Sequence, residues 1–304
     1  MAIRPYQAHD VTLPAGHNLR YYEWPGSGPN LVLLHGSSSY GLQWEWVADN
    51  LSDRFHVFAL DQRGHGDSGR PDGEYSAEEY AEDVHQFVNT LGLGSIVIGG
   101  NSLGGRVSQV FAAEYPEQCV AVILAAVHLS NFYHDRQRMA AVLESACTTL
   151  HSPTEFASRE EAVAFLKGSR GDRETEASLN HRIEHNMHRV GNGYRVKYDT
   201  VRVAQGLTHM AKDLRAYAAR VSCPVLILRS TVGSELSSEQ GAEVASLWQN
   251  GRVVDVESGY MLHLQNPVGT AAAMNAFIDS ATGAAGAYSS VHARSGPQSR
   301  PADD

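Results

Sequence analysis

Short apolar runs alternate with amphipathic stretches along most of the chain, which is typical of an α/β protein with a buried parallel sheet. The apolar runs that predict strands span residues 31–34, 56–61, 95–98, 119–127, 224–229 and 252–257. The stretches that predict helices span residues 41–50, 76–91, 106–115 and 267–280. Residues 11–24 alternate apolar and polar positions around a Gly-His-Asn turn and predict an antiparallel hairpin. Ser76 and Glu79 fit a capping box at the start of one helix.

Three motifs that contain glycine follow these predicted strands. Residues 100–104 read Gly-Asn-Ser-Leu-Gly between a strand and a helix, which is the context of a G-x-S-x-G nucleophile elbow centred on Ser102. His35-Gly36 follows the strand at 31–34, and residues 61–68 read Asp-Gln-Arg-Gly-His-Gly-Asp-Ser after the next strand. In this order and spacing, the motifs resemble those of the α/β-hydrolase superfamily over about residues 10–280.

The resemblance implies the α/β-hydrolase fold, a mostly parallel eight-stranded sheet flanked by helices with an inserted helical cap. We expect the core domain to comprise residues 1–128 and 215–280. The cap is expected at residues 129–214, where charges increase, strand signals vanish and amphipathic helical stretches appear. Residues 281–304 are rich in Ala, Gly, Ser and Pro without apolar periodicity, so we expect a disordered tail.

The elbow predicts covalent chemistry at Ser102. A serine hydroxyl is a weak nucleophile at neutral pH, so it normally needs a base and a third group that orients the base. The resemblance also implies an oxyanion hole, with the backbone N–H groups of Leu103 and Ser37 as donors. Because these are backbone groups, neither depends on the identity of a side chain.

The usual partners of such a serine are absent from their usual positions. Where the family carries its catalytic histidine, in a run like G-H-M-x-H-L-x-N-P, this chain has Tyr260. Where the family carries its acid, after the strand at 224–229, this chain has Ser234, with Glu235 one residue away as the leading substitute carboxylate. His263 lies three residues past the usual histidine and is a candidate base or a structural residue. A tyrosine is protonated at neutral pH, so Tyr260 can donate a hydrogen bond but is a poor base.

Other histidines could contact a substrate. His35, in the His-Gly motif, and His128, just beyond a predicted strand, are candidates for substrate binding. In the predicted cap, His181, His185 and His188 have spacings of four and three and would line one helix face. There they could supply a base, recognise an acid group of the substrate, or form a solvated surface. Of the three, His185 is the candidate for substrate binding. No separate carboxylate motif accompanies them, so we expect no metal site, and no cofactor is expected either.

The motifs favour serine-dependent acyl transfer. An ester or thioester donor would load Ser102, and the acyl group would pass to an acceptor, as in an acyltransferase or an atypical esterase or thioesterase. Loss of the histidine slows attack by water on the acyl-enzyme most, because water must be deprotonated to attack. Thiol or amine acceptors are stronger nucleophiles and depend less on a base. Some acyltransferases of secondary metabolism use this fold, with coenzyme A or a carrier protein as donor. The alternatives are a binding protein without catalytic activity and a lyase or cyclase with Tyr260 as proton donor.

The composition limits the kinds of binding partner and the cellular compartment that we expect. The net charge of −10 and the pI of about 5.8 argue against nucleic acid and anionic membranes, because an acidic surface repels both. The three cysteines, Cys119, Cys147 and Cys223, have no spacing typical of metal ligands or a disulfide framework. The first residues lack the apolar core of a signal peptide. We therefore expect a soluble cytoplasmic protein that acts on small molecules.

Overall fold

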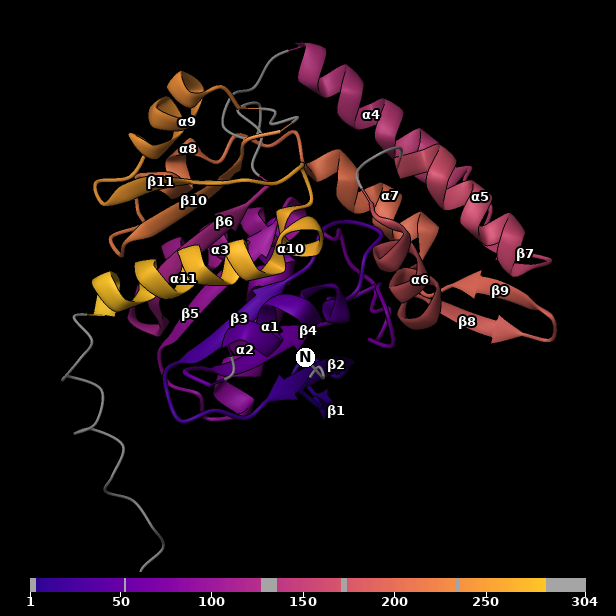
Figure 1. Cartoon of the computed structure of the whole chain (residues 1–304), viewed down its shortest axis with the longest axis horizontal. Helices are drawn as coiled ribbons and strands as arrows, with labels where there is room; N and C mark the ends of the chain where they lie inside the picture. Colours follow the sequence, from indigo (N-terminus) through magenta and orange to yellow (C-terminus); the bar gives the residue numbers. More distant parts are fainter. Residues whose placement is uncertain (1–3, 52, 127–135, 171–173, 233–235, 283–304) are drawn as a thin grey trace, which may run out of the picture.

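Eight strands form one twisted sheet at the centre of the molecule (Figure 1). The computed structural model describes residues 4–51, 53–126, 136–170, 174–232 and 236–282. The strand order is β1-β2-β4-β3-β5-β6-β10-β11, with antiparallel pairing for β1–β2 and β2–β4 and parallel pairing elsewhere. The strands are β1 Gln7–Thr12, β2 Asn18–Trp24, β3 Asn30–Leu34, β4 His56–Leu60, β5 Ile96–Asn101, β6 Cys119–Ala125, β10 Val225–Ser230 and β11 Gly251–Val256. The mostly parallel eight-stranded sheet is therefore confirmed.

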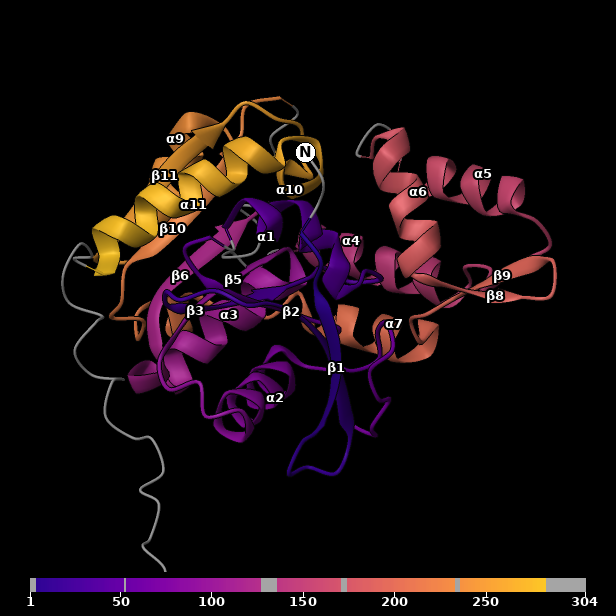
Figure 2. The ribbon, with the colours of Figure 1, turned by 60° about the horizontal axis from the view of Figure 1, so that its bottom comes forward.

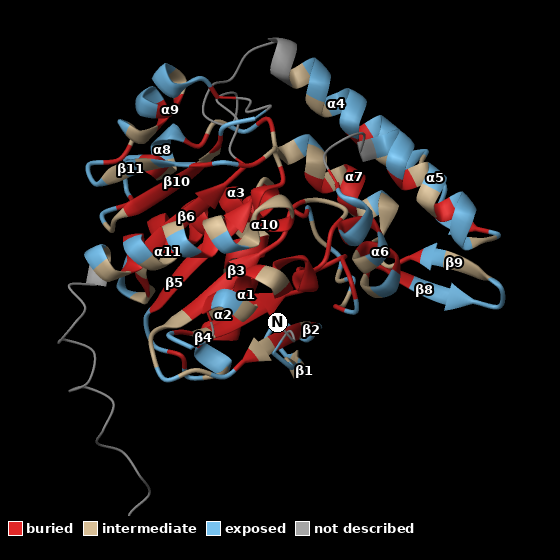
Figure 3. Cartoon of the chain, viewed as in Figure 1, coloured by how far each residue is buried: buried red, intermediate tan, exposed pale blue. Residues whose placement is uncertain are grey.

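Helices cover both faces of this sheet because successive strand residues point to opposite sides (Figures 1 and 2). In β3, Val32 and Leu34 join one hydrophobic cluster, whereas Leu31 and Leu33 join the other. The first cluster packs against α2 (Ala77–Thr90), α3 (Leu103–Glu114), α8 (Arg215–Ala218) and α9 (Ser238–Ala245). The second packs against η1 (Gly41–Trp44), α1 (Glu45–Leu51) and α11 (Pro267–Thr282). The interior strands are buried on both faces (Figure 3).

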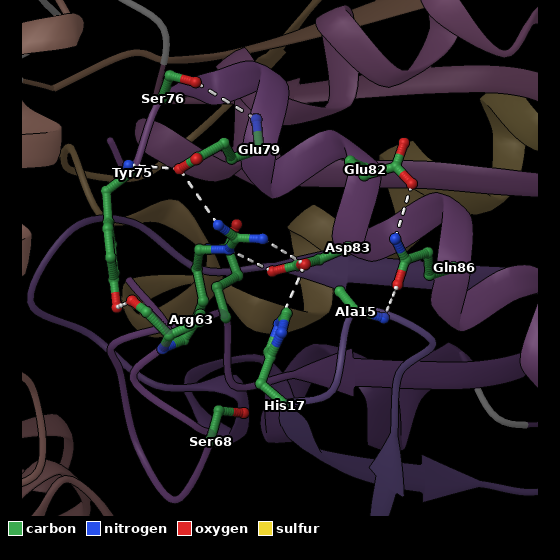
Figure 4. A network of polar contacts seen from close by, with 12 residues as sticks. Ala15, His17, Arg63, Ser68, Tyr75, Ser76, Glu79, Glu82, Asp83 and Gln86 are labelled. Atoms are coloured by element: carbon green, nitrogen blue, oxygen red, sulfur yellow. Dashed lines mark hydrogen bonds and ion pairs between the residues drawn. The ribbon is translucent and has the colours of Figure 1, made fainter. Parts of the chain in front are cut away.

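A buried polar network ties the loop after β4 to α2 (Figure 4). Both oxygens of Asp83 accept hydrogen bonds of 2.6 Å from Arg63, and His17 Nε2 lies 3.1 Å from Asp83 Oδ1. Ser76 caps α2 as predicted, since its hydroxyl accepts a bond from the Glu79 N–H. The Glu79 carboxylate accepts from the N–H of Tyr75, one residue before the position that a capping box requires. The loop is thereby fixed against the helix by charge-assisted hydrogen bonds.

The chain between β6 and β10 forms a separate layer beside the sheet (Figure 2). Its helices are α4 Arg136–Leu150, α5 Arg159–Arg170, α6 Glu176–His185 and α7 Thr200–His209, whereas the next helix, α8, packs with the sheet. A small sheet of order β7-β9-β8 completes it, from β7 Glu155–Phe156, β8 Met187–Val190 and β9 Gly193–Val196. The layer has a hydrophobic cluster of its own, which includes Phe156, Leu179 and Ile183.

The expectation of a purely helical insertion is wrong because of the β8–β9 hairpin. Its two-residue turn is Gly191-Asn192, and Gly191 has a φ of 59°, which glycine adopts without steric penalty. Two-residue Gly-containing turns of this kind match the twist of paired strands, so the hairpin signal was present in the sequence. The division into core, cap and tail at the boundaries given above stays a prediction.

The described helices are short. The longest, α11, has 16 residues, and none in the described ranges is long and apolar enough to cross a membrane. Most of the predicted tail, residues 283–304, lies outside the described residues.

Candidate active site

Ser102 stands at a sharp turn between β5 and α3. Its φ of 51° and ψ of −112° are unusual for a residue with a side chain, and such strain is typical of functional sites. A Cβ atom on Gly100 would lie 2.5 Å from the carbonyl carbon of Gly104. A Cβ on Gly104 would lie 2.3 Å from the carbonyl oxygen of Leu34. Both glycines of the motif are therefore required by the backbone, and the turn has the geometry of a nucleophile elbow.

The loop after β3 approaches this elbow closely. A Cβ atom on Gly36 would lie 3.4 Å from Ser102 Cβ and 3.0 Å from Asn101 Nδ2. The next residue is Ser37, whose backbone N–H is one of the two expected oxyanion donors. The other donor, the N–H of Leu103, opens α3, where the first N–H groups have no partner within the helix.

Contacts from two sides hold the loop in place at Ser38, which has a φ of 56°. From the core, His65 Nε2 accepts a hydrogen bond of 3.1 Å from the Ser38 N–H. From the insertion, Arg182 Nη1 and Asn186 Nδ2 donate to the Ser38 carbonyl at 3.3 and 3.2 Å. Residues that sequence reasoning did not single out, Arg182 and Asn186, thus connect the insertion to the expected oxyanion loop.

His35 and His65 support this loop as neutral imidazoles. His35 Nδ1 lies 2.7 Å from the Gly36 carbonyl oxygen, and its Nε2 accepts from the Gln62 N–H at 3.0 Å. Burial lowers the pKa of His65 to about 4 and holds that of His35 well below its ordinary value. The ring of His35 has no exposed surface, and backbone groups engage both its nitrogens. This geometry argues against the predicted contact of His35 with substrate.

The segment expected to supply the base follows β11, at the same carboxyl edge of the parallel strands as the elbow. Tyr260 stands between β11 and α10 (Leu262–Gln265) and is partly buried. The Val232 N–H donates to the Ser258 carbonyl at 3.0 Å, which joins the loop after β10 to the segment that carries Tyr260. Ser234 and Glu235 lie outside the described residues. Within the described ranges, no side chain hydrogen-bonds to the Ser102 hydroxyl.

His263 packs against a tryptophan that is hydrogen-bonded to β3. Its ring centroid lies 4.6 Å from that of Trp44, whose Nε1 donates to the Leu34 carbonyl at 3.1 Å. His263 is fully buried, and neither ring nitrogen bonds to a described residue. Burial lowers its pKa to about 3, so the ring is neutral at physiological pH. The structure thus places His263 as a core aromatic neighbour and does not place it as a base on Ser102.

The three histidines of the insertion do not share a helix. Helix α6 ends at His185, so His188 lies on β8, where its Nε2 is 3.8 Å from Asp67 Oδ1. The expectation of one helix face is therefore wrong for His188, because the hairpin begins two residues after the helix. His181 and His185 do come together, with ring centroids 4.4 Å apart, beside Glu45 of α1. His128 lies outside the described residues.

Known proteins share this architecture. A family model described as alpha/beta hydrolase fold matches residues 29–267. The chain belongs to this family. 2-(Acetamidomethylene)succinate hydrolase of Mesorhizobium japonicum is 30% identical over 256 residues, 84% of this chain and 89% of that protein. (E)-2-((N-methylformamido)methylene)succinate hydrolase of Acinetobacter baylyi is 24% identical over 284 residues, 88% of this chain and 97% of that one.

A solved structure supports the same assignment. The crystal structure of E-2-(acetamidomethylene)succinate hydrolase matches with a TM-score of 0.80 and 29% identity, and the match covers 90% of this chain and 100% of that one. The predicted α/β-hydrolase fold is confirmed, and the protein is an enzyme of the hydrolase type.

Proposed function

We propose that Ser102 forms a covalent acyl-enzyme with a small ester, thioester or amide and passes the acyl group to an acceptor. The elbow carries the proposal, because its strained serine stands beside the loop that begins at Gly36. In the first step, Ser102 Oγ bonds to the acyl carbon and the bond to the leaving group breaks. The serine proton ends on the leaving group, so no cofactor is needed.

Backbone donors would stabilise the transition state of this step. Negative charge develops on the acyl oxygen, and the N–H groups of Ser37 and Leu103 are the donors proposed to receive it. One such donor is worth about 10²–10³ in rate in serine hydrolases. The N-terminus of α3 adds a favourable dipole at the same place. This arrangement supports catalysis even without a histidine on Ser102.

The second step is where Tyr260 matters. A phenol is a good hydrogen-bond donor but a poor base at neutral pH, so it does not activate water well. A thiol or amine acceptor is a stronger nucleophile and needs less assistance. Tyr260 at the histidine position therefore favours transfer to such an acceptor over hydrolysis. Coenzyme A or a carrier protein is the donor or acceptor class that fits a thiol.

Hydrolysis is the second candidate, and the relatives favour it. Besides the two succinate-derivative hydrolases, N-formylmaleamate deformylase of Pseudomonas putida is 35% identical over 100 residues, 33% of this chain. These names point to amides of small dicarboxylic acids as substrates to be tried here. Such a reaction would need a base that replaces the histidine.

Intact mass spectrometry tests the acyl-enzyme directly. The protein and its Ser102→Ala variant are exposed briefly to activated esters, thioesters and 2-(acetamidomethylene)succinate. We expect an acyl adduct on the parent chain that Ser102→Ala lacks, that persists in water and that thiols or amines discharge. Rapid discharge by water would favour the hydrolase. Equal turnover by the parent chain and Ser102→Ala, with no adduct on either, would overturn the acyl-enzyme and favour a lyase.

A further inference from the structure

Three side chains with metal-binding groups meet where the insertion touches the core. Glu45 begins α1, whereas His181 and His185 lie four residues apart on α6. One donor atom from each lies within 4.8 Å of the other two. We propose that these residues bind a divalent transition-metal ion of the zinc class. The site is independent of the acyl chemistry proposed for Ser102.

The donor set suits such an ion. Two imidazoles and one carboxylate form a common set of protein ligands for zinc, and they leave a fourth position for water or an anionic ligand. Residues four apart on a helix project to the same side, which is how α6 presents both histidines. In a tetrahedral site with bonds of about 2.1 Å, neighbouring ligand atoms are about 3.4 Å apart. Small side-chain rotations would therefore bring these atoms, now within 4.8 Å, into place.

Tyr40 supplies the outer contact that such a histidine normally has. Its hydroxyl lies 2.8 Å from His181 Nδ1, while His181 Nε2 lies 2.6 Å from Glu45 Oε2. When Nε2 binds the metal, the ring proton resides on Nδ1 and is donated to the tyrosine oxygen, which fixes the ring orientation. Tyr40 is itself held firmly, since it is buried and the Arg182 guanidinium lies 5.3 Å from its ring centroid.

Two of the proposed ligands lie where little water reaches them. The side chains of His181 and Glu45 are only 9% and 12% exposed, so their hydration competes little with the ion. Without metal, His181 and Glu45 hydrogen-bond to each other, and the ion would replace this contact.

The ion would connect the two layers near the oxyanion loop. Helix α6 also carries Arg182, which donates to the Ser38 carbonyl. A metal that bridges α6 to α1 would fix the helix and thereby the support of that loop. We therefore expect zinc to slow amide exchange in α6.

Calorimetric titration of the full chain with zinc chloride, after removal of metals by a chelator, tests the proposal. We expect one ion per chain. His181→Ala and His185→Gln should each weaken binding by more than about 100-fold, beyond the 10–100-fold expected for Tyr40→Phe as an outer contact. His188→Ala is the matched control, because it removes a nearby histidine that lies outside the cluster, and it should leave binding unchanged.

Several outcomes would overturn the site. Absence of zinc binding at millimolar concentration would do so, and so would undiminished binding in both His181→Ala and His185→Gln. Circular dichroism of each variant separates loss of ligand from loss of fold, and the partly exposed His185 offers the milder substitution. If zinc leaves the hydrogen exchange of α6 unchanged, the proposed bridging of α6 to α1 is overturned, but zinc binding itself is not.

Discussion

The two halves of the candidate site are built differently. In the half that carries the nucleophile, the backbone of Gly100, Gly104 and Gly36 fixes the position of Ser102, and buried histidines hold the adjacent loop. In the half expected to carry the base, the sequence predicts Tyr260 at the position of the family's histidine, and His263 is buried against Trp44. The residues of the first half are all described, whereas Ser234 and Glu235 of the second half lie outside the described residues.

This difference shows which parts of an active site are tied to the fold. A side chain on Gly104 would clash with the backbone of β3, and one on Gly100 would clash with the backbone of Gly104, so selection for stability alone preserves the geometry of the elbow. Loops after β10 and β11 carry their chemistry in side chains, which can change without disturbing the sheet. An intact elbow therefore indicates the fold more strongly than it indicates a particular reaction.

The largest loss of stability is expected from Asp83→Ala. This variant removes the carboxylate that binds Arg63 in the buried network supporting the first half of the site. Arg63 would lose its two bonds of 2.6 Å while remaining buried, which costs about 3–5 kcal/mol in comparable buried pairs. Because the Arg63 carbonyl accepts from His65 Nδ1, the loss should also loosen the loop at Ser38. Urea denaturation measures the free energy of unfolding.

Glu114→Ala is the control for this prediction. Glu114 pairs with Arg220 on the surface, where both side chains are more than a third exposed, so a change below about 1 kcal/mol is expected. Equal losses for the two variants would contradict the importance given to the buried network.

The next effect is expected from Gly104→Ala in the elbow. Its new Cβ atom would lie 2.3 Å from the carbonyl oxygen of Leu34, which is backbone and cannot rotate away. Overpacking of this kind costs about 3 kcal/mol. The variant should lose stability in urea and form no adduct at Ser102.

Gly168→Ala provides the comparison in α5. A Cβ atom there has no neighbour within 4 Å, so the change should be neutral or stabilising by up to about 1 kcal/mol. A Gly104→Ala variant as stable as Gly168→Ala would show that the elbow backbone can shift. The first half would then be no more constrained by the fold than the second.

Sequence alone sufficed for the sheet and for the elbow, because local patterns encode both. Glycine spacing around Ser102 and apolar runs of strand length need no knowledge of distant contacts. The cluster of Glu45 with His181 and His185 could not be predicted, since it joins residues 136 positions apart in sequence through the packing of α6 on the core. The buried state of His263 was likewise invisible, because it depends on Trp44 rather than on its own neighbours in the chain.

Lowering the pH should destabilise both halves of the site, because each contains a buried neutral histidine. The pKa of His263 is lowered to about 3 and that of His65 to about 4, whereas unfolded histidine titrates near ~6.5. The unfolded state therefore binds protons first, so stability is full above pH ~6.5 and falls as the pH decreases toward these values. Each such histidine contributes about 1.4 kcal/mol per pH unit, or about 2 kcal/mol between pH ~6.5 and ~5.

His263→Phe isolates the contribution of the second half of the site to this pH dependence of stability. It keeps an aromatic ring beside Trp44 and removes one titrating group, so the slope of stability against pH should fall by one proton between pH ~6.5 and ~5. The exposed His151→Phe is the control for the loss of a histidine outside the core. An unchanged slope in His263→Phe would mean that this imidazole is not kept neutral by burial.

The smallest effect is expected from restoring a base to the second half. Tyr260→His places an imidazole where the family carries one, and hydrolysis of an activated ester should rise by about tenfold, below the 10²–10⁴ that a fully oriented base supplies. Tyr260→Phe is the matched control, because it removes the hydroxyl without adding a base and should not accelerate hydrolysis. The gain must vanish when Ser102→Ala is added to Tyr260→His. If Tyr260→His gives no gain while Ser102 still acylates, the carboxylate that orients a histidine is missing as well, and both changed loops then belong to a site that no longer uses water.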